Sequence, residues 1–170
     1  ENYTVLEAAR EAQINIPTLC YLKDVQQIGA CRLCLVEIKG ARAYQAACVA
    51  PISDGMEIYT NTEKLRKVRK INLELILSTH NRECTSCVRS GNCELAALCK
   101  EYGVNDYPYD GEKFEYEVDD LSPSLVRDNS KCISCRRCIA ACNDVQKIGA
   151  IGPSLRGDKT IIGSIFGKSL

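Results

Sequence analysis

The spacing of its cysteines restricts the fold of this chain more than any other feature does. The sequence has 12 cysteines in 170 residues, and ten of them stand in C-x2-C, C-x3-C or C-x5-C steps. Such steps suit ligands of one shared metal centre. Disulfides, which an even count allows, are disfavoured because sulfurs this close together in sequence rarely join distant segments. The pattern therefore predicts several metal sites.

The remaining composition narrows the class of protein. The sequence shows no charged start leading to an apolar run and a cleavage site, and no stretch of about 18 apolar residues. We therefore expect a cytoplasmic, reducing setting without a membrane span, where thiols bind metals. Zero net charge gives no indication of nucleic acid binding or of an anionic membrane surface.

Charge is unevenly distributed along the chain. Residues 61–100 hold eight Lys or Arg against four acidic residues, whereas residues 101–120 hold eight acidic residues against one Lys. A docking face for an electron-transfer partner is one interpretation. A solvated face beside an acidic linker is the other, and we favour it.

Local patterns predict a chain of mixed helices and strands. Thr4 and Glu7 form a capping-box signature before a helix over 5–13. Further helices are expected over 62–79, from its apolar positions, and over 94–102. Strands are expected over 33–38, 44–49 and 56–59, weakly over 124–127, and over 160–163, with a turn at 53–55 joining the second and third. Residues 105–120 read as a connector.

The first cysteine group consists of Cys20, Cys31, Cys34 and Cys48. Four thiolates hold a 2Fe-2S cluster, and the plant-type arrangement has three ligands on one loop and the fourth farther along. Gly29 and Ala30 suit that loop because small residues let backbone N–H groups approach the sulfurs. Zinc is the alternative, but closed zinc sites usually use two C-x2-C pairs and only one is present.

The second group has the pattern H-x3-C-x2-C-x5-C and contains the only histidine of the chain. Its members are His80, Cys84, Cys87 and Cys93. One imidazole and three thiolates would complete a 4Fe-4S cluster, and a zinc site is the main alternative. Cys99 is either a different fourth ligand or a spare buried thiol, and we favour the spare.

The third group, C-x2-C-x2-C-x3-C, matches the run of bacterial ferredoxins apart from Asn143, where proline is usual. Its members are Cys132, Cys135, Cys138 and Cys142. In two-cluster ferredoxins the last cysteine of the run binds the other cluster, and no second run follows here. Either the sequence stops inside a two-cluster module, which we favour, or Cys142 closes its own cluster.

With these motifs, the whole chain resembles the amino-terminal iron-sulfur region of the large subunit of multisubunit, NAD-linked, electron-bifurcating FeFe hydrogenases. The first two motifs are shared with the large iron-sulfur subunit of complex I and with some NAD-dependent formate dehydrogenases. The third motif and its sequel look hydrogenase-like; the residues are 136–138, 143–146, 148–152 and 156–157.

The resemblance implies an α+β architecture in three parts. These are a β-grasp 2Fe-2S ferredoxin-like domain over 1–61 that lacks its first hairpin, a 4Fe-4S module with histidine and three cysteines over 62–110, and a truncated 4Fe-4S ferredoxin-like module over 111–170. It also implies one 2Fe-2S cluster and one to three 4Fe-4S clusters. The implied partners are a flavin-containing NAD(P)-binding subunit, a small 2Fe-2S subunit and ferredoxin.

The residues contain no pairing of nucleophile and base, no phosphate-binding glycine loop and no open catalytic metal position. The sequence therefore predicts a conductor of electrons for an oxidoreductase rather than a catalytic unit. The equivalent wiring of a formate dehydrogenase, a nickel-iron hydrogenase or a complex I-like enzyme is the alternative. A zinc-stabilised assembly module is the alternative from another class.

Overall fold

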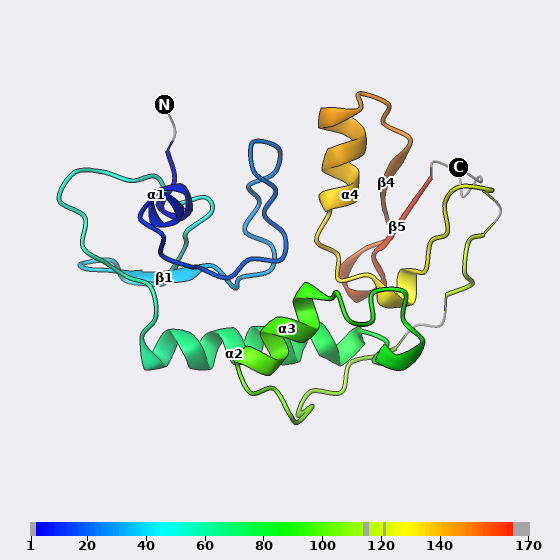
Figure 1. Ribbon diagram of the computed structural model, residues 1–170, viewed down its shortest axis with the longest axis horizontal. Coiled ribbons are helices and arrows are strands. Elements are labelled where there is room, and N and C mark those ends of the chain that lie inside the picture. The colour runs from blue at the N-terminus through cyan, green and yellow to red at the C-terminus, as the bar shows by residue number, and fades with distance from the viewer. Residues whose placement is uncertain (1–2, 114–115, 121, 165–170) are drawn as a thin grey trace.

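The structure, a computed structural model, describes residues 3–113, 116–120 and 122–164. Helices and strands alternate along the chain without a long βαβ repeat (Figure 1). The main elements are α1 (Val5–Glu11), β1 (Leu35–Ile38), β2 (Gln45–Ala46), β3 (Ile58–Tyr59), α2 (Glu63–Thr79), α3 (Glu94–Glu101), α4 (Arg137–Ala140), β4 (Ile151–Ser154) and β5 (Ile161–Ser164). This mixture agrees with the expected α+β class.

The first part of the chain packs α1 against a small antiparallel sheet, and the first apolar core lies between them. The capping box is present as expected, because Thr4 Oγ1 accepts the Glu7 N–H at 3.3 Å and Glu7 Oε2 accepts the Thr4 N–H at 2.8 Å. The sheet has the order β2-β1-β3. The expected hairpin between the second and third strands is therefore wrong, since β3 pairs with the other edge of β1 and Glu37 lies opposite Tyr59.

The long helix α2 begins after Thr62, whose side chain accepts the Leu65 N–H, and ends at His80. Four of its six buried positions, 65, 69, 73 and 77, follow a spacing of four residues and form its buried stripe. The apolar positions that predicted the helix included Leu75, which is 49% exposed. The helix was predicted correctly, but the face that is buried differs from the predicted apolar face. The reason is that an arginine is one of the buried residues.

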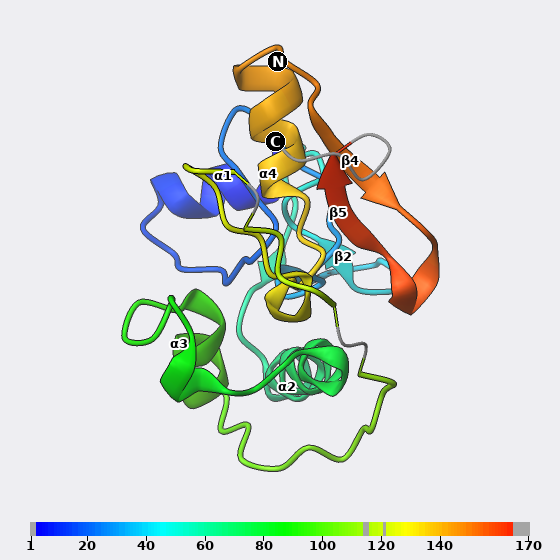
Figure 2. The same cartoon turned by 90° about the vertical axis from the view of Figure 1, so that its right-hand side faces the viewer.

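A second apolar core joins all parts of the chain. It contains Leu19 and Leu33 from the first part, Leu73 and Leu77 from α2, Leu95 from α3, and Val104, with Ile133 packed at its edge. Consequently α2 runs beneath both the first sheet and the later α4 region, with α3 alongside it (Figures 1 and 2).

The last part of the chain is an antiparallel β4–β5 hairpin beside α4, which continues as a π-helical turn over Ala141–Val145. The strand expected over 160–163 is confirmed as β5, and any continuation past 164 lies outside the described residues. The weak strand over 124–127 is wrong in extent, since only Arg127 pairs, with Asp119.

Candidate iron-sulfur sites

The four cysteines of the first group lie together, on the loops around β1 and β2. Three of them are fully buried, and all twelve cysteines of the chain, each within the described ranges, are free of disulfides. The Sγ atoms of Cys34 and Cys48 are 3.4 Å apart. Cys20 and Cys31 form a second pair, linked by their side chains and by the Cys31 N–H, which donates to Cys20 Sγ at 3.4 Å.

The arrangement into two sulfur pairs fits a two-iron centre. A tetrahedral metal with metal–sulfur bonds of about 2.3 Å separates its sulfurs by about 3.8 Å. The Cys34–Cys48 separation is close to that value. Two such pairs are what two bridged irons require. Within the described part of the chain, no three or more His, Cys, Asp or Glu side chains surround the position of a single metal ion.

Within each pair, the pKa of one cysteine is raised and that of the other is lowered. The pKa of Cys31 is lowered to about 5, mainly because its thiolate accepts a hydrogen bond from the Cys20 side chain, and that contact raises the pKa of Cys20. In the same way, Cys34 lowers the pKa of Cys48 while its own pKa is raised. Because the thiolate is the metal-binding form, these contacts favour metal binding by one sulfur of each pair.

Backbone N–H groups converge on these sulfurs, as the small residues of the loop predict. Gly29 donates to Cys48 and Ala30 to Cys20, and both contacts favour the thiolates by lowering their pKa. The Leu19 N–H donates to Cys31 Sγ at 3.4 Å. Gly29 has a φ of 60°, a left-handed conformation in which glycine carries no steric cost. The loop therefore provides the donors that tune sulfur-bound iron.

The second group gathers where α2 ends and α3 begins. His80 caps α2, and its buried Nδ1 has no hydrogen-bond partner among the described residues. Burial lowers the pKa of His80, and the Lys131 ammonium adds to the effect, so the imidazole is neutral as a metal ligand must be. His80, Cys87 and Cys93 line a cavity of about 260 Å³. Cys84 is exposed beside them.

Cys99 lies close to this group on α3. Burial raises its pKa to about 11, with smaller contributions from Cys93 and Cys84. It also packs against the second apolar core. At neutral pH it is a protonated thiol in an apolar setting, which agrees with a spare cysteine, although its role stays a prediction.

In the third group, three cysteines influence one another electrostatically, and the fourth, Cys142, lies in the turn that follows α4. The pKa values of Cys132 and Cys138 are raised first by burial and then by Cys135. Ser134 and Arg136 have φ of 54° and 60°, and a left-handed residue beside a right-handed one can turn successive N–H groups toward one point. Buried Cys142 instead accepts the Ala150 N–H on its Sγ at 3.3 Å.

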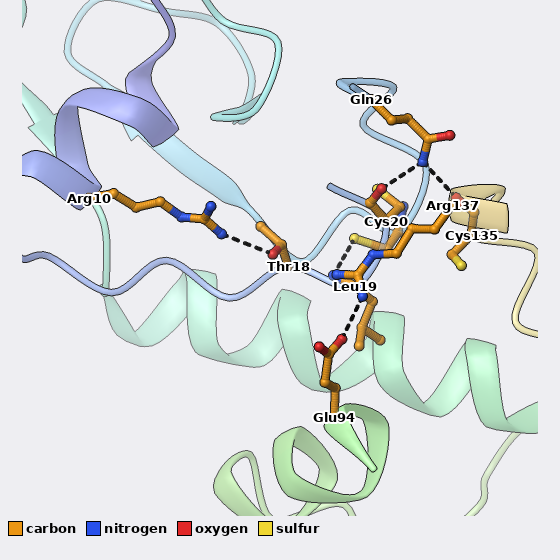
Figure 3. A network of polar contacts seen from close by, with 9 residues as sticks. Arg10, Thr18, Leu19, Cys20, Gln26, Glu94, Cys135 and Arg137 are labelled. Atoms are coloured by element: carbon orange, nitrogen blue, oxygen red, sulfur yellow. Dashed lines mark hydrogen bonds and ion pairs between the residues drawn. The ribbon is translucent and has the colours of Figure 1, made fainter. Parts of the chain in front are cut away.

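Three side chains outside the expected ligand sets tie the groups together. Gln26 Nε2 donates to Cys20 O at 2.6 Å and to Cys135 O at 2.9 Å, which joins the first group to the third (Figure 3). Lys131 Nζ donates to Asn81 Oδ1 at 2.8 Å, which holds the loop after His80. Arg137 pairs with Glu94 at 2.8 Å. These contacts fix the third group against the other two.

Known families match two parts of the chain. Residues 1–63 match the 2Fe-2S iron-sulfur cluster binding domain, and residues 69–108 match the NADH-ubiquinone oxidoreductase-G iron-sulfur binding region. The fold and its sites therefore define an iron-sulfur protein, with a 2Fe-2S binding domain followed by a 4Fe-4S binding region. None of the helices in the described ranges is long and apolar enough to cross a membrane.

The crystal structure of an NAD+-reducing [NiFe]-hydrogenase in the H2-reduced state superposes with a TM-score of 0.88 at 33% identity, covering 95% of this chain and 68% of that one. The chain belongs to the family of amino-terminal iron-sulfur regions from the large subunits of NAD(P)-reducing hydrogenases and complex I.

Two curated relatives extend over almost all of this chain. The NADP-reducing hydrogenase subunit HndD of Solidesulfovibrio fructosivorans is 38% identical over 175 residues. The NADH-ubiquinone oxidoreductase 75 kDa subunit of Reclinomonas americana is 32% identical over 165 residues. These matches cover 100% and 97% of this chain but only 30% and 24% of the relatives.

Proposed function

We propose that this chain is the electron-conducting segment of an NAD(P)-linked hydrogenase. It relays single electrons among a flavin-containing NAD(P)-binding subunit, ferredoxin and a hydrogen-activating site, next to a small 2Fe-2S subunit. The observation that carries the proposal is the first group, in which buried sulfurs stand in two pairs with backbone donors aimed at them. Bound at such sites, iron-sulfur clusters would supply one-electron redox chemistry.

The ligand sets follow the three groups. We assign the 2Fe-2S site to Cys20, Cys31, Cys34 and Cys48, and the second site to His80, Cys84, Cys87 and Cys93. Cys132, Cys135 and Cys138 hold the third site, and Cys142 serves a second cluster. The division at 1–61, 62–110 and 111–170 gives each site its own segment, although the second apolar core crosses these boundaries.

The surrounding protein excludes water from these sites, places positive charge near them and holds them against one another. Burial of Cys20, Cys34 and Cys48 keeps water from the first site. Lys131 and Arg137 place positive charge on the cavity that the second and third groups share, where it offsets the negative charge of thiolates. The Gln26 amide holds the first group against the third without adding charge.

Anaerobic protein provides the test of this function. Iron and acid-labile sulfide analysis with electron paramagnetic resonance (EPR) should detect one 2Fe-2S signal and 4Fe-4S signals. Cys34→Ser should alter or remove only the 2Fe-2S signal, whereas the matched change Cys99→Ser should leave every signal in place. Colourless protein that contains zinc and no sulfide would overturn the proposal in favour of an assembly module.

We propose an FeFe hydrogenase as the parent enzyme because the third motif and its sequel look hydrogenase-like and lie within the 38% identity to a hydrogenase subunit. A nickel-iron hydrogenase is the second candidate, since a structure of that class superposes over 95% of the chain. Metal analysis of the complex isolated with this chain separates them. Iron without nickel supports the first candidate, and stoichiometric nickel supports the second.

A further inference from the structure

The buried stripe of α2 contains one cation. Arg69 occupies the second of its four positions and is 1% exposed, between the apolar Leu65 and Leu73. It is the largest of the fully buried side chains in the described part of the protein. A charged group in such a place needs a compensating partner, because transferring an unpaired ion out of water costs several kcal/mol.

The contacts of Arg69 are all with neutral acceptors. Its Nε donates to Leu33 O at 2.9 Å, and its Nη2 donates to Leu35 O at 2.9 Å and to Thr60 O at 2.7 Å. Its Nη1 donates to Tyr102 Oη at 3.4 Å. Among the residues that the structure describes, no carboxylate pairs with this guanidinium. Arginine remains protonated in proteins, so the charge itself stays without an anion.

The position of Arg69 identifies the missing anion. The two carbonyls that it binds belong to Leu33 and Leu35, the residues on either side of Cys34. Backbone dimensions then place the guanidinium within about 10 Å of Cys34 Sγ, one of the four sulfurs of the first site. Two ferric irons, two sulfides and four thiolates carry two negative charges in total, and one-electron reduction adds a third.

We propose that Arg69 is the buried counter-charge of the 2Fe-2S site and raises its reduction potential. This inference rests on the proposed function, because it requires a cluster on Cys34 and its three companions. Arg69 is a positioning and charge-tuning residue. Its positive charge stabilises the reduced state, with three negative charges, more than the oxidised state, with two. Removing the charge therefore lowers the potential.

The test is a redox titration of the cluster-loaded full chain, followed through the EPR signal of the reduced 2Fe-2S site. Arg69→Gln keeps N–H donors but removes the charge, and Arg69→Lys keeps the charge with fewer donors. At an effective dielectric constant near 20, a charge about 10 Å away changes the reduction equilibrium by about tenfold. Tenfold corresponds to about 59 mV for one electron.

The two variants separate the effect of the charge of Arg69 from the effect of its hydrogen bonds. We expect Arg69→Gln to lower the potential by about 59 mV and Arg69→Lys to leave it within about a third of that shift. The matched control is Lys67→Met, which removes a positive charge from the same helix at a side chain that is 71% exposed. Water and salt screen that charge, so the potential should not change.

The outcomes separate this inference from the proposed function. A 2Fe-2S signal in the unaltered protein, with equal potentials in Arg69→Gln and the unaltered protein, overturns the counter-charge alone. Absence of that signal from the unaltered protein overturns the function on which it rests. If Arg69→Gln loses its cluster, Arg69→Lys decides: retention of cluster and potential supports the role of charge, and loss shows that Arg69 only anchors α2 through its hydrogen bonds.

Discussion

Replacing Gln26 with leucine removes both hydrogen bonds that join the first site to the third while keeping a side chain of similar size. Gln26 is 7% exposed, and its Nε2 is 2.6 Å from Cys20 O and 2.9 Å from Cys135 O. Each bond contributes about 1 kcal/mol net, and a buried acceptor left without its donor costs about 1–3 kcal/mol. We therefore expect a loss of about 2–4 kcal/mol in the contact between the two loops.

Native-state amide hydrogen exchange measures that loss directly. The free energy of local opening should fall at the loop over 20–31 and also at the loop over 132–138. A loss of about 2–4 kcal/mol corresponds to exchange that is about 30 to 1,000 times faster. The parallel change at two loops 109 residues apart identifies the contact between them, because a purely local defect would affect only the first loop.

The neighbouring residue provides the control. Gln27 is exposed, and its amide donates to Glu7 Oε1 at 3.0 Å. Gln27→Leu should change the opening free energy by less than about 0.5 kcal/mol, as surface substitutions usually do. Protection in Gln26→Leu that stays within that range at the loop over 132–138 would refute the tie between the sites.

Three further changes test other parts of the structure. His80→Cys should retain the second cluster but lower its potential by at least about 59 mV in a redox titration, because a thiolate adds negative charge. Thr4→Ala should cost about 1 kcal/mol in thermal unfolding at pH 7. The Thr4 N–H and then the Thr4 hydroxyl lower the pKa of Glu7 below its ordinary 4.5. The substitution removes the hydroxyl contact, whose contribution is present above that value and is lost as the pH falls below it. Gly111→Ala should lower the free energy of unfolding by about 1–3 kcal/mol, because its Cβ would lie 2.9 Å from Thr79 Cγ2.

Each of these predictions has a clear contrary result. An unchanged potential in His80→Cys removes His80 from the ligand set. A Thr4→Ala cost that is equal at pH 3 and pH 7 means that the Glu7 carboxylate takes no part in the cap. The control for Gly111→Ala is Gly152→Ala, where a Cβ would meet nothing within 4 Å. Equal losses of stability in the two variants would exclude the steric explanation.

Features set by neighbouring residues could be predicted from the sequence. The capping box at Thr4, the start of α2 after Thr62 and the start of α3 at Glu94 were all expected and are all present. The pairing of β3 with β1 was not expected. A turn signal at 53–55 indicates that the chain reverses, but it does not indicate at which edge of the sheet the next strand pairs. The β4 strand was missed because Pro153 argues against a strand away from a sheet edge.

In the candidate sites, too, the local features could be predicted from the sequence and the long-range contacts could not. Cysteine spacing predicted the first group, whose sulfurs lie in two close pairs, since ligands of one centre are usually close in sequence. The side chains that surround them come from far away and carry no local signal, as Gln26 reaching Cys135 shows. Arg69 did have a signal, a fixed spacing of four with Leu65, Leu73 and Leu77, but a pattern search for apolar residues passes over a charged one.

The helix α2 sets the distance between the first and the second proposed cluster sites. Arg69 donates to the carbonyls on either side of Cys34, and His80 stands 11 residues later, a span of about 17 Å along the axis. One inserted residue would lengthen the span by about 1.5 Å and also turn His80 by about 100° away from its cysteines. Shortening or lengthening the helix between these residues would therefore break one site while leaving its ligand sequence intact. Relatives that bind both clusters should therefore keep the number of residues between Arg69 and His80, even where its exposed residues differ.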